Sequence, residues 1–112
     1  MKRVLVLIHF TAKREGAAFL QIGKTAIAAV QSNLTDSAAF LNSNICFGFV
    51  GFTPLEVSDL HKVLTKAIAP KIGDNISVLQ LDDNIISTHP GLMEWQATTV
   101  IRAAREKPSP WK

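Results

Sequence analysis

The residues that could contact a negatively charged ligand lie near the two ends of the chain. A short polar segment, residues 11–15, precedes the expected start of a helix at Gly16 and contains adjacent cations. Free N–H groups at a helix start, with cations beside them, attract anions such as phosphate. Further cations near Trp111 fit either a strand-binding segment or a solvated chain end. The cations that we expect to bind nucleic acid or another anion are Lys13, Arg14, Arg102, Arg105 and Lys107.

His9 is the candidate for acid–base chemistry. It stands at the end of an apolar run, residues 3–10, close to Thr11 and to the first group of cations. A general acid or a phosphate contact could be positioned at this place. The competing interpretation is a half-buried histidine at a strand end. We take His9 as the candidate catalytic residue.

The sequence predicts neither a metal site nor a cofactor. The spacing of the three histidines does not resemble a zinc site, and a single cysteine, Cys46, provides no thiolate cluster. Asp82 and Asp83 are adjacent, and neighbouring side chains of an extended chain leave opposite faces. We therefore expect these carboxylates to be solvated charges at a strand end. Cys46 lies in an apolar run and is expected to be a small buried residue.

Length and composition indicate one folded domain. The chain has 112 residues, of which 47% are hydrophobic and 19% charged, as in ordinary globular proteins. The formal net charge is +3, with basic ends around an acidic middle. This asymmetry fits a surface that contacts phosphate, two copies docking through opposite charges, or scattered solvated charge.

No segment has the length and apolar character of a membrane helix. Residues 16–30 come nearest, and Gln21 and Lys24 interrupt them. The single cysteine excludes a disulfide within the chain, which is typical of reducing compartments. We expect a soluble, cytoplasmic protein.

The hydrophobic periodicity predicts alternating strands and helices. Spacings of three and four mark helices, and compact or alternating apolar runs bounded by Asn, Ser, Asp and Gly mark strands. Residues 84–87 are a candidate fifth edge strand. The predicted elements are a strand at 3–10, a helix at 16–34, a hairpin of 37–41 and 45–52, a helix from Thr53 to about 69, a strand at 76–81 and a helix at 90–106.

Two local patterns refine this outline. Residues 53–56 read Thr-Pro-Leu-Glu, the spacing of a capping box in which Thr53 and Glu56 satisfy each other's backbone N–H groups. In the second arm of the hairpin, Phe47 and Phe49 point one way, while Gly48 and Gly51 leave room on the other face for helix packing or a bulge.

The predicted order is βαββαβ, and we therefore expect an α+β, ferredoxin-like sandwich over residues 1–88. A C-terminal helix and basic tail, residues 89–112, follow it. Both crossover helices would cover one sheet face and leave the other apolar face to a second copy or to the C-terminal helix. We expect the partner interface to contain Phe47, Phe49 and Trp95.

The chain resembles a known family at this point. Ile8-His9-Phe10, the segment 41–45 that leads into Phe47 and Phe49, and the elements at 53–64 and 74–81 are similar to the small ferredoxin-fold proteins of CRISPR spacer acquisition and their stand-alone, toxin-like endoribonuclease relatives.

The resemblance implies a homodimer that contacts nucleic acid, in some members with metal-dependent phosphodiesterase activity. In members that cleave, an aspartate at the end of the first strand binds the metal. His9 takes that place here, and a lone neutral imidazole does not hold a hard cation such as Mg²⁺. The resemblance therefore favours binding over catalysis.

Three functional hypotheses follow. The first is a homodimeric binding protein of a defence or mobile-element system, which contacts nucleic acid or a protein through Lys13, Arg14 and the basic tail. The second is a regulatory or inhibitory protein-interaction module that uses the sheet and the Trp95 helix without a nucleic-acid role. The third is a weak metal-dependent endoribonuclease. Steep salt dependence of nucleic-acid binding would separate the first from the second.

Overall fold

A computed structural model describes the backbone of residues 1–11, 16–43, 45–82, 88 and 90–106, and most side chains within these ranges, those of 16–19 and 99–106 excepted. The elements in chain order are β1 (Lys2–His9), α1 (Gly16–Asn33), β2 (Thr35–Asn42), β3 (Cys46–Thr53), α2 (Val57–Ile68), β4 (Asn75–Leu81) and α3 (Pro90–Glu106).

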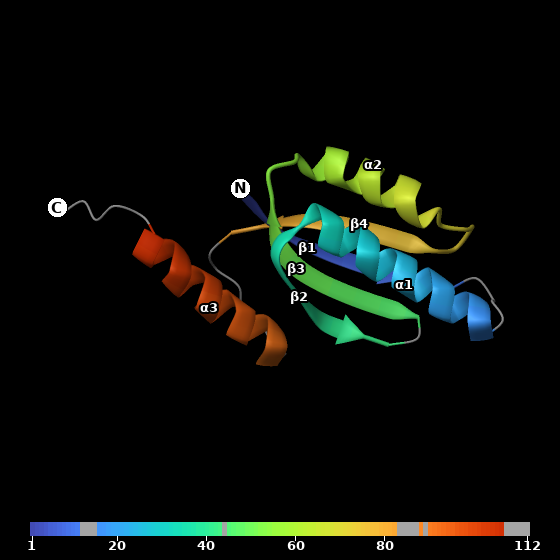
Figure 1. Ribbon diagram of the computed structural model, residues 1–112, viewed down its shortest axis with the longest axis horizontal. Coiled ribbons are helices and arrows are strands. Elements are labelled where there is room, and N and C mark those ends of the chain that lie inside the picture. The colour runs from blue at the N-terminus through green and yellow to red at the C-terminus, as the bar shows by residue number, and fades with distance from the viewer. Residues whose placement is uncertain (12–15, 44, 83–87, 89, 107–112) are drawn as a thin grey trace.

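The four strands form one antiparallel sheet in the order β2-β3-β1-β4. Helices α1 and α2 lie side by side over one face of this sheet, and α3 lies on the other side, next to β2 (Figure 1). The expected α+β class is confirmed. The sheet and three helices are compatible with a ferredoxin-like fold.

The face under α1 and α2 holds the main core. Alternate residues of β1 point to this face because side chains of a strand leave it on opposite sides. The helices supply apolar residues at spacings of three and four, such as Leu60, Leu64 and Ile68 of α2. The fully or almost fully buried members of this core include Val4, Val6, Ile8, Phe10, Ala26, Val30, Phe49, Leu60, Leu64 and Ile68.

Phe47 and Phe49 belong to this core and are only 5% and 3% exposed. Phe47 meets Phe10 edge to face at 6.0 Å between ring centroids, and Gly23 of α1 lies directly against it. The helices therefore cover the phenylalanine face of β3, whereas the sequence left room on the glycine face for either helix packing or a bulge. Both side chains contact their own chain here, so a partner surface on the sheet must use other residues.

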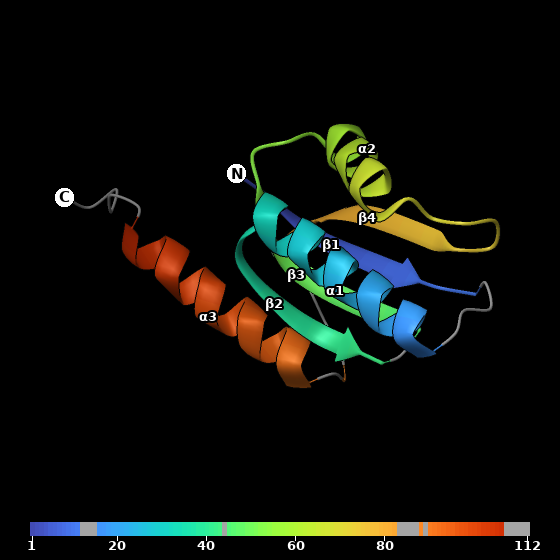
Figure 2. The same ribbon diagram turned by 45° about the vertical axis from the view of Figure 1, so that its right-hand side comes forward.

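The opposite sheet face carries a second, smaller cluster. Val50 of β3 packs there with Leu92 and Trp95 of α3, and all three are at most 7% exposed. The half-buried side chains of Leu5 and Phe52 border it. The C-terminal helix thus covers part of the apolar face that was expected to need cover. Figures 1 and 2 show that α3 begins beside β2 and then runs beyond the edge of the sheet.

Helix α2 begins later than the sequence indicated. Its first residue is Val57 and its N-cap is Glu56, which makes no side-chain capping bond. The Thr53 hydroxyl, fully buried, accepts a hydrogen bond from the N–H of Leu55 at 3.1 Å, so the chain turns before the helix starts. Glu56 instead pairs with Lys2 at 2.8 Å. The predicted capping box is therefore wrong, because Thr53 bonds within the turn at Leu55 and Glu56 pairs with Lys2 of β1.

The loop between α2 and β4 is tied to the end of β1. The Asp74 carboxylate accepts hydrogen bonds from the N–H of Thr11 at 3.0 Å and of Lys71 at 2.9 Å. The Thr11 hydroxyl donates to the carbonyl of Gly73, which adopts a φ of +93° that favours glycine. The candidate fifth strand at 84–87 lies outside the described residues.

Candidate functional site

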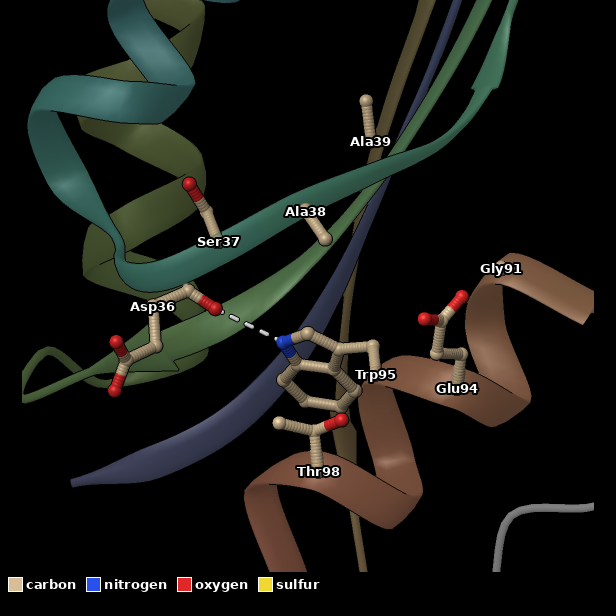
Figure 3. Close-up of a pocket in the computed structure, with 8 residues that line it drawn as sticks. All are labelled: Asp36, Ser37, Ala38, Ala39, Gly91, Glu94, Trp95 and Thr98. Atoms are coloured by element: carbon tan, nitrogen blue, oxygen red, sulfur yellow. Dashed lines mark hydrogen bonds between the residues drawn. The ribbon is translucent and has the colours of Figure 1, made fainter. Parts of the chain in front are cut away.

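A groove separates the edge strand β2 from helix α3. Its volume is about 420 Å³, within the range of roughly 300–1,000 Å³ that is usual for ligand sites. Figure 3 shows β2 as one wall and the helix, with the Trp95 ring, as the other. The lining residues are Asp36, Ser37, Ala38, Ala39, Gly91, Glu94, Trp95 and Thr98.

The edge of β2 forms the strand wall of the groove. Ser37 and Ala39 leave the strand on the side of α1, whereas Ala38 points toward α3 (Figure 3). Residues from both faces of β2 line the groove, so the backbone edge between them borders it as well. In the described part of the chain, β3 is the only neighbour of β2 in the sheet.

The helix wall consists of Gly91, Glu94, Trp95 and Thr98. Their spacing of three and four residues places them on one face of α3. Trp95 joins this helix to the strand because its indole Nε1–H donates to the carbonyl oxygen of Asp36 at 2.9 Å. Asp36 has a φ of +52°, a left-handed conformation that aspartate tolerates better than most residues. The strand backbone is therefore turned at the point where the tryptophan binds.

The guanidinium of Arg3, on β1, packs against the Trp95 ring. Its guanidinium carbon lies 5.5 Å from the centroid of the Phe52 ring and 5.8 Å from that of Trp95. The two rings are 5.6 Å apart and inclined by 38°. Arg3 is only 9% exposed and donates to the carbonyl of Asp82 at 3.1 Å. Cation–π contact, ring packing and hydrogen bonding together hold Trp95 on the sheet.

The groove has negative charge. Among the described residues that line it, the charged ones are Asp36 and Glu94, and both are exposed acids. Ser37 and Thr98 add hydroxyl groups, while Ala38, Ala39 and Trp95 supply apolar surface. Such a site attracts cationic groups and gives them a partly apolar wall to lie against.

His9 ends β1 and is exposed, between Cys46 of β3 and Asn75 of β4 in the strand register. The N–H of Phe10 donates to the carbonyl of Ile45 at 2.7 Å, so His9 and Cys46 form a non-hydrogen-bonded pair, the closer of the two antiparallel arrangements. The structure therefore sets a half-buried thiol beside an exposed imidazole. Cys46 was expected to be buried and is only partly so.

The predicted anion-binding residues are distributed as follows. Lys13, Arg14 and Lys107 lie outside the described residues. Arg102 and Arg105 belong to the last turns of α3, where the structure describes the backbone and not the side chains. The proposed nucleic-acid contacts of all five remain predictions.

Within the described ranges, no group of three or more histidine, cysteine, aspartate and glutamate side chains is placed to hold a metal ion. His61 of α2 makes a hydrogen bond between its Nε2 and the carbonyl oxygen of Ile76 at 3.0 Å, which joins the helix to β4. None of the helices in the described part of the chain is long and apolar enough to cross a membrane.

The sequence interpretation missed three residues that build the groove region, namely Arg3, Asp36 and Glu94. Glu94 precedes Trp95 on a predicted helix, so helical spacing could have indicated a shared surface. Arg3 belongs to the basic N-terminal end of the sequence and Asp36 to its acidic middle, and neither position carries a local signal of a shared site. Only the folded chain brings Asp36 within reach of α3.

No family model, no curated protein and no solved structure matches this chain. The interpretation of the groove therefore depends on its own chemistry.

Proposed function

We propose that this chain is a ferredoxin-like protein-interaction module that binds a segment of a protein partner in the groove between β2 and α3. The observation that carries the proposal is the groove itself, about 420 Å³ in volume, with an aromatic side chain on one wall and the edge of a strand on the other. Trp95 is 7% exposed, so a partner would meet a small part of its ring together with the strand wall and Thr98.

The anchoring of Trp95 supports this proposal. Interaction sites work best when their residues are already held in the binding conformation. Three separate contacts, to the carbonyl of Asp36, to Phe52 and to Arg3, hold the indole in place. The wall that a partner would meet is thus preorganised in the free protein.

A blocking variant tests the proposal. Thr98 is exposed on the helix wall, so Thr98→Arg would fill the groove without disturbing the buried cluster. Peptides selected from a random eight-residue display library on the wild-type chain should lose at least about tenfold in affinity for Thr98→Arg. Ala28→Arg, an exposed site on α1, is the matched control and should bind like wild type. Equal binding to all three chains would contradict the proposal.

A nucleic-acid role is the second candidate, and the arrangement of lysines favours it. Lys24 of α1 and Lys62 and Lys66 of α2 are exposed on the helical side of the sheet, with Lys71 just after α2. These four lysines outnumber Asp59, the exposed acid of α2, whereas the charged residues that line the groove are both acids. The homodimeric nucleic-acid binding implied by the resemblance to spacer-acquisition proteins would use this side together with Lys13 and Arg14.

Salt dependence tests the second candidate. Binding of a short single-stranded RNA or of duplex DNA should weaken steeply between 50 and 200 mM salt, as expected for phosphate contacts. The double variant Lys62→Gln/Lys66→Gln should reduce the slope of log affinity against log salt. No binding at the lowest salt would remove this candidate, and sedimentation of the free chain would test the dimer.

A further inference from the structure

We propose that the occupant of the groove is an extended, positively charged peptide segment that pairs with β2 as an additional strand. This inference depends on the proposed function and names the chemistry of the partner. It combines two independent features of the groove, the strand edge on one wall and the acidic side chains around it.

The strand edge favours an extended occupant. An edge strand presents N–H and C=O groups to its open side, and an added strand satisfies them by main-chain hydrogen bonds. Ser37, Ala38 and Ala39 have small side chains, so a second backbone can come close along this stretch. A helical segment has its main-chain groups bonded internally and offers none to β2.

The turn at Asp36 limits where pairing can begin. Its carbonyl oxygen receives the Trp95 indole N–H, and its φ of +52° departs from strand geometry. Pairing is therefore expected from Ser37 to Ala39, the stretch of β2 that lines the groove. The pairing of β2 with β3 is irregular between Thr35 and Ala38 and again between Ala39 and Leu41. Such irregularities twist an edge strand and limit pairing along its whole length, so the expected contact is confined to the short stretch at the groove.

The acidic side chains of the groove favour an occupant with lysine or arginine side chains. Alternate residues of an added strand point to the same side, so every second side chain would face α3. Glu94 is exposed on that wall. Lysine or arginine at these alternate positions would lay its methylene groups along Ala38 and the exposed part of Trp95 and bring its charge to the Glu94 carboxylate.

Synthetic eight-residue peptides test the inference. The probe alternates Val with Lys, its charge control alternates Val with Glu, and a third peptide is the Val/Lys probe with N-methyl groups on alternate backbone nitrogens along one edge. Trp95 fluorescence reports binding in a Trp111→Phe background, which leaves a single tryptophan in the sequence. Backbone amide shifts of residues 37–42 report the strand wall.

The Val/Lys probe should bind, change the Trp95 emission and shift the amides of Ser37 to Ala39. The Val/Glu and N-methylated peptides should bind at least about tenfold more weakly. Glu94→Gln should weaken the probe about two- to fivefold and flatten its salt dependence, as expected for one exposed charge pair. Asp59→Asn, which removes an exposed carboxylate from α2, is the matched control and should leave binding unchanged.

The outcomes separate the inference from the proposed function. Equal affinity for the Val/Glu peptide, or full affinity of the N-methylated one, would overturn the inference. If library-selected peptides still depend on the groove, the proposed function survives such a result. Failure of every peptide, probe and library alike, to perturb Trp95 or the β2 amides would overturn both.

Discussion

The two faces of the sheet are covered in different ways. Under α1 and α2, residues from both helices and three strands form a continuous apolar core whose central side chains are fully buried. On the other face, the buried cluster consists of Val50, Leu92 and Trp95, and the attachment of α3 includes a polar contact at the sheet edge. The first face holds the larger buried core. The second face uses one anchored aromatic residue to hold α3 beside β2, and the groove lies between them.

The largest loss of stability should come from a substitution in the core under α1 and α2. Leu64 is fully buried in the main core, and Leu64→Ala should lower the free energy of unfolding by about 2–5 kcal/mol through lost burial and a cavity. Val63, its neighbour on α2, is 40% exposed, and Val63→Ala should change stability by less than about 0.5 kcal/mol. Denaturant unfolding followed by circular dichroism measures both. Similar losses for the two variants would show that this face is not the main core.

Removal of the Trp95 side chain from the second face should lower the free energy of unfolding less than Leu64→Ala does. The effect should be confined to α3 and its surroundings. Trp95→Ala should lower stability by about 1–3 kcal/mol, below the cost of a Trp deletion in a closed core, because α3 can detach while the sheet stays folded. Hydrogen exchange should accelerate in α3 and stay slow in β1. Equal loss of protection in both elements would mean that α3 folds as part of the main core. Trp95→Phe, which keeps a ring and loses the bond to Asp36, should cost about 1 kcal/mol.

Loss of the Asp74 contacts, in the loop between α2 and β4, should have an intermediate effect on stability. Asp74→Ala removes an acceptor from the N–H groups of Thr11 and Lys71, and stability should fall by about 1–2 kcal/mol. Exchange of the Thr11 amide should accelerate, while the α3 amides stay unchanged. A variant as stable as wild type would show that water replaces the carboxylate without loss.

The smallest change in stability should come from loss of the ion pair between Lys2 and Glu56. The Glu56 side chain is 68% exposed, so the pair is strongly screened by solvent. Glu56→Gln should change the free energy of unfolding by no more than about 0.5 kcal/mol, and added salt should reduce even that difference. A loss above 1 kcal/mol in thermal or denaturant unfolding would show that the helix start depends on this contact.

Periodicity alone was sufficient to predict most elements. The helix expected at 16–34 is Gly16–Asn33, and the one expected at 90–106 is Pro90–Glu106. The hairpin turn after Asn42 is likewise confirmed, with a longer first arm than expected. These elements have strong local signals, namely helical spacing or turn residues between apolar runs, which do not depend on distant contacts.

The start of α2 shows where local signals failed. The Thr53–Glu56 pattern predicted a cap, but Thr53 ends β3 as a buried residue and Glu56 faces Lys2 from β1. Contacts between segments distant in sequence therefore decided which conformation these residues adopt. The groove follows the same rule, since Asp36 and Trp95 meet only after the sheet has formed.

The sequence by itself determined the kinds of elements, their order and the need to cover both faces of an apolar sheet. The tertiary structure decided which face of β3 receives the helices. Alternation divides Phe47 and Phe49 from Val50 and Phe52, but both sets are apolar, so the pattern cannot rank them. Packing made that choice: α1 lies against Phe47 at Gly23, and Val50 and Phe52 are left to Trp95. The same packing places Trp95 beside β2, where the groove lies.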